Sequence, residues 1–440
     1  MLCLAAWARG PEYDEAYSIF LTAGHARPAW PQGVFTASSV RWLYQGHAGL
    51  GRIALDLRRG DVHPPLYFWA LELWRRAAGP GWLAARLLSV GLTLAGLAGL
   101  ARIARLLRLP AGPVLAMALL SYGFAYSGIL ARPFALAQAG NIAGVFCALR
   151  ADKDQRAAWA LTAGACFGAA AFTDYLAVFT GAAMLAWLCW RNRLQAALAL
   201  AAMLPFLAAC FWFFMGQHGS RNGQFAPFAW HAALAQMARD GGGALFGGLP
   251  LYAGRAGGLV AALLAALALA CLGFAMRRAA GRGFLLLAAA TPAGLLALGV
   301  VFRNTPIEIR YLAFALPWVA LAIAPALPRW LLAPLLAVQG LAVAGLLLAT
   351  ATMQPQGRAA RLAAAWPGAV VALPYGNDGV GIPGPFIAAA PDSMRILLLR
   401  PGDVAPPGAV RAAIRGDAAS RAVAAQMGCA ALVCGPWSNM

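Results

Sequence analysis

The dominant feature of this sequence is a series of apolar segments, each near the length that crosses a lipid bilayer. A membrane-spanning helix needs about 20 consecutive, mostly apolar residues, and about ten segments approach that length. The sequence therefore predicts an all-α polytopic membrane protein. We expect the spans near residues 83–101, 111–130, 133–149, 157–172, 174–190, 194–215, 256–276, 283–302, 311–327 and 330–350.

The overall composition excludes a soluble protein built around one aqueous core. Hydrophobic residues make up 62% of the 440 residues and charged residues only 11%, whereas a soluble domain carries roughly 25% charged residues. The formal net charge of +19 would suit a nucleic-acid partner in a soluble chain. Here the arginines cluster in short loops between apolar segments, where membrane topology places them. We therefore expect membrane lipids, and no nucleic acid, as partners.

The basic loops also assign an orientation, because positive residues accumulate in cytoplasmic loops. Every second loop is basic, and placing all of them in the cytoplasm gives a consistent alternation. The other loops then lie outside, so we expect a cell inner-membrane protein with its chemistry on the periplasmic side. The basic clusters are Arg102, Arg105 and Arg108; Arg150, Lys153 and Arg156; Arg191 and Arg193; Arg277, Arg278 and Arg282; and Arg329.

This topology divides the chain into three regions. Residues 1–82 form a first outer region, residues 83–350 the transmembrane domain, and residues 351–440 a small outer domain. Segment 64–78 would measure only about 20 Å as a helix, against a bilayer core of about 30 Å. We therefore expect an interfacial helix there, with Pro64 and Pro65 in its first turn.

The two ends of the chain differ in character from the apolar middle. Residues 1–8 are apolar but too short to span, and we expect them to be the stub of a truncated first membrane helix. The tail has short apolar runs at 369–374 and 395–399 and a helix-like stretch near 418–427, which predict a small α/β fold. Cys429 and Cys434 could form a disulfide if the tail lies outside the cytoplasm.

The titratable side chains gather on the predicted outer side. Of the 15 acidic residues, only Asp152 and Asp154 fall in a predicted cytoplasmic loop, and all five histidines fall in outer loops. None lies in the middle of a span. This distribution argues against an ion-coupled transporter, whose carboxylates usually lie near the membrane midplane.

Two acidic clusters of the first outer region are candidate sites. Asp14 and Glu15 could supply a general base that takes a proton from an acceptor hydroxyl; the alternative is that acids simply favour a helix N-terminus. Asp61 and His63 precede the interfacial helix and could hold a metal or a phosphate. The alternative for Asp61 is a helix cap.

Arginines near the outer ends of spans form the third candidate group, because guanidinium forks match phosphate oxygens. For any one of these arginines, snorkelling to the lipid headgroups is an alternative. Glu308 could also simply pair with Arg310. The arginines are Arg86, Arg132, Arg303 and Arg310.

Five short motifs in this order resemble those of the GT-C membrane glycosyltransferases, specifically the bacterial relatives of protein O-mannosyltransferases and of the lipid A aminoarabinose transferase. The resemblance covers roughly residues 11–350, and the tail carries no such motif. The motifs are YDEAY (13–17), DVHPPLYF (61–68), ARLLS (85–89), ARPFAL (131–136) and EIRYL (308–312).

The resemblance implies transfer of a sugar from a polyprenyl-phosphate donor to an acceptor hydroxyl, with inversion at the anomeric carbon. Asp14 matches the catalytic acid of the family, Glu15 its neighbour, and Asp61 a second acidic position linked to metal or acceptor contacts. His63 stands where some relatives have lysine. Relatives also have a membrane helix before the acidic pair. The positive charge that phosphate departure needs would come from Arg132, Arg310, Arg86, His63 or a metal.

Two other functions stay open at this point. A transporter or flippase of lipid-linked sugars would need polar groups deep in the spans, where Gln138 and Asn141 are the few candidates. An inactive, truncated relative could act as a scaffold. No cofactor is implied beyond a divalent metal ion, for which Asp61 and His63 are the candidate ligands. The sequence does not name the sugar, and the acceptor could be a glycan, a lipid or a protein.

Overall fold

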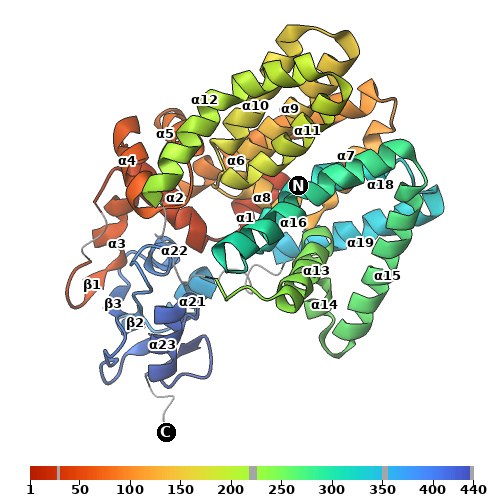
Figure 1. Cartoon of the computed structure of the whole chain (residues 1–440). Helices are drawn as coiled ribbons and strands as arrows, with labels where there is room; N and C mark the ends of the chain where they lie inside the picture. The colour runs from red at the N-terminus through yellow and green to blue at the C-terminus, as the bar shows by residue number, and fades with distance from the viewer. Residues whose placement is uncertain (27–29, 218–224, 349–354, 437–440) are drawn as a thin grey trace. The chain divides into compact units, whose positions relative to one another are not determined.

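A computed structural model describes residues 1–26, 30–217, 225–348 and 355–436 (Figure 1). The chain is mostly helical with one small sheet, and it separates into two compact units. Unit 1 comprises residues 1–3, 54–67 and 89–346, and unit 2 comprises residues 4–53, 68–88 and 347–440. Several unit boundaries fall within helices, among them α4 (Leu50–Gly60), α5 (Leu66–Ala78) and α6 (Trp82–Leu106).

The membrane-spanning helices confirm the predicted polytopic α-helical class. Six helices of the described residues are long and apolar enough to span, and a bent pair makes up to seven. Each remaining predicted span coincides with a shorter apolar helical segment. The six are α6, α9 (Phe134–Asp154), α12 (Arg193–Gln217), α15 (Gly257–Met276), α16 (Ala279–Phe302) and α19 (Arg329–Leu348); the shorter segments are α10 (Ala157–Ala171), η2 (Tyr175–Ala177) with α11 (Val178–Arg191), and α17 (Ile309–Leu312) with η4 (Ala313–Ala315) and α18 (Leu316–Ile323).

The predicted span at 111–130 is broken rather than straight. It consists of α7 (Ala111–Leu120) and α8 (Tyr122–Ile129), which meet at an angle of 70°. Ser121 between them has an extended backbone, and its hydroxyl donates to the carbonyl of Met117 at 2.7 Å. The amide of Gln339 donates to the same hydroxyl at 3.1 Å. Polar partners at the break replace the missing helical hydrogen bonds inside the lipid-facing bundle.

Close packing of small residues holds the spans of unit 1 together. Helices α9, α10, α11 and α12 lie side by side (Figure 1). A Cβ placed on Gly164 of α10 would lie 1.9 Å from the carbonyl oxygen of Ala199 on α12, so these two backbones require glycine there. Such contacts drive helix association in membranes. The hydrophobic effect contributes little free energy there, because the lipid tails are as apolar as the side chains. The shorter elements of this unit are α13 (Trp230–Phe246), α14 (Leu249–Tyr252) and η3 (Gly254–Ala256).

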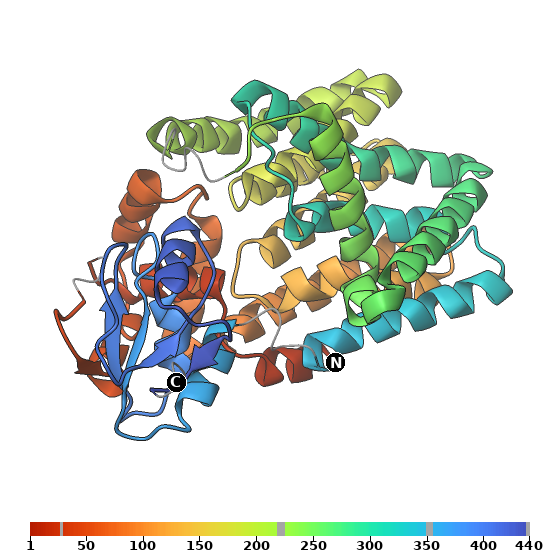
Figure 2. The same cartoon turned by 90° about the horizontal axis from the view of Figure 1, so that it is seen from below.

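Unit 2 contains a five-stranded sheet in the order β1-β3-β2-β4-β5. Most of its strands come from the C-terminal part of the chain, drawn in blue in Figure 2. Strand β2 pairs in parallel with β3 and β4, and the edge strands β1 and β5 pair antiparallel. The expected runs at 369–374 and 395–399 are strands β2 and β3, whereas β1 comes from the N-terminal part of the chain. The strands are β1 (Phe35–Thr36), β2 (Val370–Pro374), β3 (Arg395–Leu399), β4 (Val410–Ala412) and β5 (Val433–Cys434).

The helices of unit 2 come from both ends of the chain, and one of them confirms the helix expected near 418–427. That helix is α23, and Asp417 caps it by accepting a hydrogen bond from the amide of Ser420 at 2.8 Å. A disulfide joins Cys429 to Cys434, as their placement suggested. The helices are α1 (Leu2–Ala8), α2 (Tyr13–Ala23), α3 (Ala37–Val40), η1 (Arg41–Tyr44), α21 (Pro355–Ala363), α22 (Pro383–Ala389) and α23 (Ala418–Gln426).

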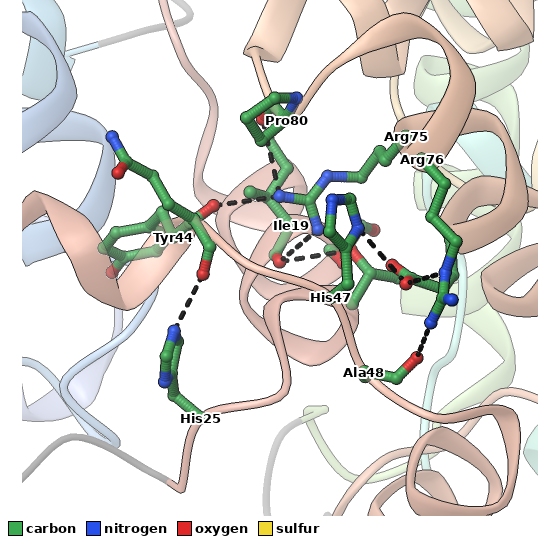
Figure 3. Close-up of polar contacts among 12 residues, drawn as sticks. Ile19, His25, Tyr44, His47, Ala48, Arg75, Arg76 and Pro80 are labelled. Carbon is green, nitrogen blue, oxygen red and sulfur yellow. Dashed lines mark hydrogen bonds and ion pairs between the residues drawn. The ribbon is translucent and has the colours of Figure 1, made fainter.

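The segment predicted as an interfacial helix is α5, which begins one residue after the two prolines rather than at them. Its Arg75 is fully buried, and the guanidinium donates to the carbonyls of Tyr44 at 2.9 Å and Pro80 at 3.4 Å (Figure 3). It also donates to the Thr22 hydroxyl at 2.6 Å. Burial lowers the pKa of Arg75, although Glu72 nearby opposes that shift. Arg75 therefore links the segments of Thr22, Tyr44 and Pro80 through hydrogen bonds, and it does not face lipid headgroups.

Candidate functional site

The loop between α4 and α5 brings Asp61 and His63 into direct contact. Both side chains are buried, at 3% and 7% exposure. One carboxylate oxygen of Asp61 accepts from the amide of Val62 at 2.6 Å and from Nδ1 of His63 at 2.8 Å. A carboxylate bonded to one ring nitrogen fixes the ring's tautomer and turns the other nitrogen outward. Asp61 therefore orients His63.

Arg132 approaches the other side of the same imidazole. It lies in the short loop between α8 and α9 and is 3% exposed. Its Nη2 lies 3.4 Å from Nε2 of His63. Two predicted site residues, His63 and Arg132, thus meet through their polar atoms.

Asp174 belongs to the same cluster, although no motif in the sequence singled it out. It lies between α10 and η2 and is 3% exposed. Its Oδ1 caps η2 by accepting from the amide of Leu176 at 3.0 Å. Burial raises the pKa of Asp174, while the charges of His63 and Arg132 and the bond from Leu176 partly lower it. We call Asp61, His63, Arg132 and Asp174 the unit 1 cluster.

Hydrogen bonds between loops hold the unit 1 cluster together. The side-chain amide of Gln217, at the end of α12, donates to the carbonyls of Leu57 at 3.0 Å and His63 at 2.9 Å. The Gln217 carbonyl oxygen accepts from the Tyr175 hydroxyl at 2.8 Å. The amide of Leu66 also donates to the carbonyl of Phe172 at 3.4 Å. These bonds fix the loop of His63 against the turn of Asp174.

Apolar packing brings the start of α17, which carries Arg310, to the same loops. Tyr311 packs with Phe134, which follows Arg132, and with Ala177 in the turn after Asp174. The rings of Phe134 and Tyr311 have centroids 6.3 Å apart. Arg310 itself forms an ion pair with Glu308 at 2.5 Å. A role for Arg310 at a phosphate therefore remains a prediction.

In unit 2, the first turn of α2 separates the two adjacent candidate acids. Glu15 is fully buried and accepts from Nε of Arg86 at 2.8 Å and from its Nη2. The other N–H groups of Arg86 donate to the carbonyls of Ala6 at 2.9 Å, Arg9 at 2.5 Å and Gly10 at 2.6 Å. A guanidinium has five N–H donors, and all five of Arg86 are directed at protein oxygens. This pattern is that of a structural ion pair.

Asp14, in contrast, is only partly buried on the same turn. The preceding residue, Tyr13, donates from its hydroxyl to Oδ2 of Asp417 at 3.3 Å. Its ring packs against Gly381, where a Cβ would lie 2.4 Å from a ring carbon. The tail domain thus contacts the turn that carries Asp14, and a role for Asp14 as general base stays a prediction.

The structure gives a metal no complete set of ligands among the described residues. Within the part of the chain described, no three His, Cys, Asp or Glu side chains come together as a metal site requires. Asp61 and His63, the predicted candidates, bond to each other. A metal at these residues stays an open prediction.

Comparison with solved structures identifies the fold. The chain is similar to the crystal structure of ArnT from Cupriavidus metallidurans bound to undecaprenyl phosphate, with a TM-score of 0.50 and 14% sequence identity over 91% of this chain and 85% of that chain. The apo structure of the same protein gives a TM-score of 0.49 with 14% identity, covering 92% of this chain and 84% of that chain. Neither a family model nor a curated protein sequence matches the chain. The chain therefore has an ArnT-like fold, in agreement with the resemblance to the lipid A aminoarabinose transferase inferred from its five motifs.

Proposed function

We propose that this protein is a membrane glycosyltransferase that moves a sugar from a polyprenyl-phosphate donor to an acceptor hydroxyl. The observation that carries the proposal is the buried contact among Asp61, His63 and Arg132. A solved protein of the same fold binds undecaprenyl phosphate. Buried cationic groups at loop ends of a membrane bundle are costly unless they serve an anion or a partner.

In the proposed reaction, each group has one task. The acceptor oxygen attacks the anomeric carbon while its proton passes to the carboxylate of Asp14. The bond from the anomeric carbon to the phosphate oxygen breaks, and polyprenyl phosphate leaves as an anion. Arg132 and His63 stabilise the charge that develops on that phosphate. Attack from the side opposite the leaving phosphate inverts the anomeric carbon.

The proposed location is the cell inner membrane with the reaction on the periplasmic side. The disulfide between Cys429 and Cys434 supports this orientation, because disulfides persist in oxidising compartments. The regular alternation of basic loops supports it independently. The disulfide supports an outer location for the tail domain, and the alternation of basic loops supports one for the loops of Asp61 and Arg310.

One of the two polar residues that could have favoured transport, Asn141, has a structural role. Asn141 is 2% exposed, and its amide donates to the carbonyl of Ala177 at 3.2 Å. This bond ties α9 to the turn after Asp174. Gln138 lies one helical turn before it on α9 and is 5% exposed. Asn141 thus supports the unit 1 cluster rather than a path through the bilayer.

Deleting the gene is expected to remove one sugar from a glycan or glycolipid of the cell envelope. Mass spectrometry of envelope glycans and glycolipids from deletion and parent strains would identify that sugar and its acceptor. The wild-type gene should restore the missing mass, and the Asp14→Asn gene should not. Identical envelope profiles in deletion and parent strains would contradict the proposed function.

A further inference from the structure

The carboxylate of Asp174 has one oxygen that the fold does not use. Oδ1 caps η2, whereas Oδ2 is buried and has no hydrogen-bond partner within the described residues. A cap alone does not require an acid, because Asn, Ser or Thr caps equally well. Burying a carboxylate oxygen without a partner costs stability. When a buried acid destabilises the fold in this way and no structural role requires an acid there, it is a candidate for contact with a ligand.

The position of Asp174 indicates which part of a ligand its side chain would contact. Its turn is bonded on one side to the loop of His63, through Leu66 and through Gln217. On the other side, Asn141 holds the carbonyl of Ala177. The charges of His63 and Arg132 both act on Asp174. Asp174 is therefore the acidic neighbour of the two groups that we assign to the donor phosphate.

We propose that Oδ2 of Asp174 accepts a hydrogen bond from a hydroxyl of the donor sugar, next to the phosphate held by Arg132 and His63. This inference rests on the proposed function and adds a residue that recognises the sugar. A carboxylate would repel a phosphate but is a strong acceptor for sugar hydroxyls. The sugar is joined directly to the phosphate, so an acceptor beside the phosphate-binding groups lies at the right distance from the reacting atoms.

The Asp174→Asn variant separates this role from helix capping. Asparagine keeps the Oδ1 cap and the shape of the side chain but replaces the acceptor Oδ2 by an NH₂ donor. We expect the protein to bind polyprenyl phosphate as before and to lose preference for the sugar-bearing form. Hydrogen bonds to charged groups contribute about 1.5–3 kcal/mol, so that preference should fall about 10- to 100-fold.

Native mass spectrometry measures this preference directly. Wild-type and variant proteins, purified in detergent, are incubated with a lipid extract from the source cells' membranes, and the ratio of sugar-bearing to sugar-free polyprenyl phosphate bound is compared. Asp174→Ala, which loses the cap as well, should give the same fall in ratio. Because Asp174→Asn keeps the cap and removes only an oxygen without a hydrogen-bond partner, it should melt at about the same temperature as the wild type.

The outcomes separate this inference from the proposed function. An unchanged ratio of sugar-bearing to sugar-free lipid bound by Asp174→Asn would overturn the sugar contact. An equal loss of binding of both lipid forms would also overturn it, and would assign Asp174 to phosphate binding or to folding. Failure of the wild-type protein to bind any polyprenyl phosphate would instead overturn the proposed function.

Discussion

Replacing Asp14 by asparagine is expected to lower the turnover number for sugar transfer by roughly 10²- to 10⁴-fold, the usual contribution of a general base. Asp14 is only partly buried, so the isosteric change removes the proton acceptor and leaves the packing of α2 in place. Its adjacent turn is held independently by the bond from Tyr13 to Asp417. The variant should therefore insert into the membrane and melt within a few degrees of the wild type.

The measurement is transfer of labelled sugar from polyprenyl phosphate in membranes that contain equal amounts of each protein. The neighbouring Glu15→Gln variant is the matched control. Glu15 is buried against Arg86, so that change should act on stability and leave the turnover number of the folded fraction intact. Transfer at the wild-type rate by Asp14→Asn would refute its role as general base.

Replacing Arg86 by methionine is expected to lower the free energy of unfolding by about 3–5 kcal/mol, the usual cost of removing one partner of a buried ion pair. The change leaves the fully buried carboxylate of Glu15 without its cation. It also leaves the carbonyls of Ala6, Arg9 and Gly10 without their donor. Unfolding in mixed detergent micelles measures the loss.

The double variant Arg86→Met with Glu15→Met provides the control for Arg86. Removing both charges replaces an ion pair by apolar side chains, which is often close to neutral. The double variant should therefore recover most of the stability lost by Arg86→Met. A single variant within about 1 kcal/mol of the wild type would show that the pair is not a structural element, and would return Arg86 to the set of candidate phosphate ligands.

The membrane-spanning part of the fold could be predicted from the sequence because lipid imposes length and apolarity on every crossing helix. The break at Ser121 could not, because it depends on Gln339 from a distant span. Strands β2 and β3 were visible as apolar runs. Strand β1 has only two residues, and its partner Ile396 lies in the C-terminal part of the chain. No local sequence pattern therefore predicts this strand.

The candidate site was predictable where residues lie in motifs and not where tertiary packing decides. The spacing of Asp61 and His63 placed both at the start of one helix, and the structure joins them. The neighbours Asp14 and Glu15 look equivalent in sequence. Only the approach of Arg86 distinguishes the buried acid from the accessible one. Asp174 is a single acid in a turn, and its burial depends on Gln217 and on the loop 61–66.

Binding of undecaprenyl phosphate to the purified protein tests most directly whether the unit 1 cluster is a phosphate site. Native mass spectrometry would compare the wild type with Arg132→Ala and with Arg191→Ala, a control whose guanidinium pairs with Asp152 and is half-exposed. We expect the control to bind as the wild type does and Arg132→Ala to bind about 10- to 100-fold more weakly, since a charge-assisted hydrogen bond contributes about 1.5–3 kcal/mol. Equal affinity of the folded Arg132→Ala variant and the wild type would contradict the account.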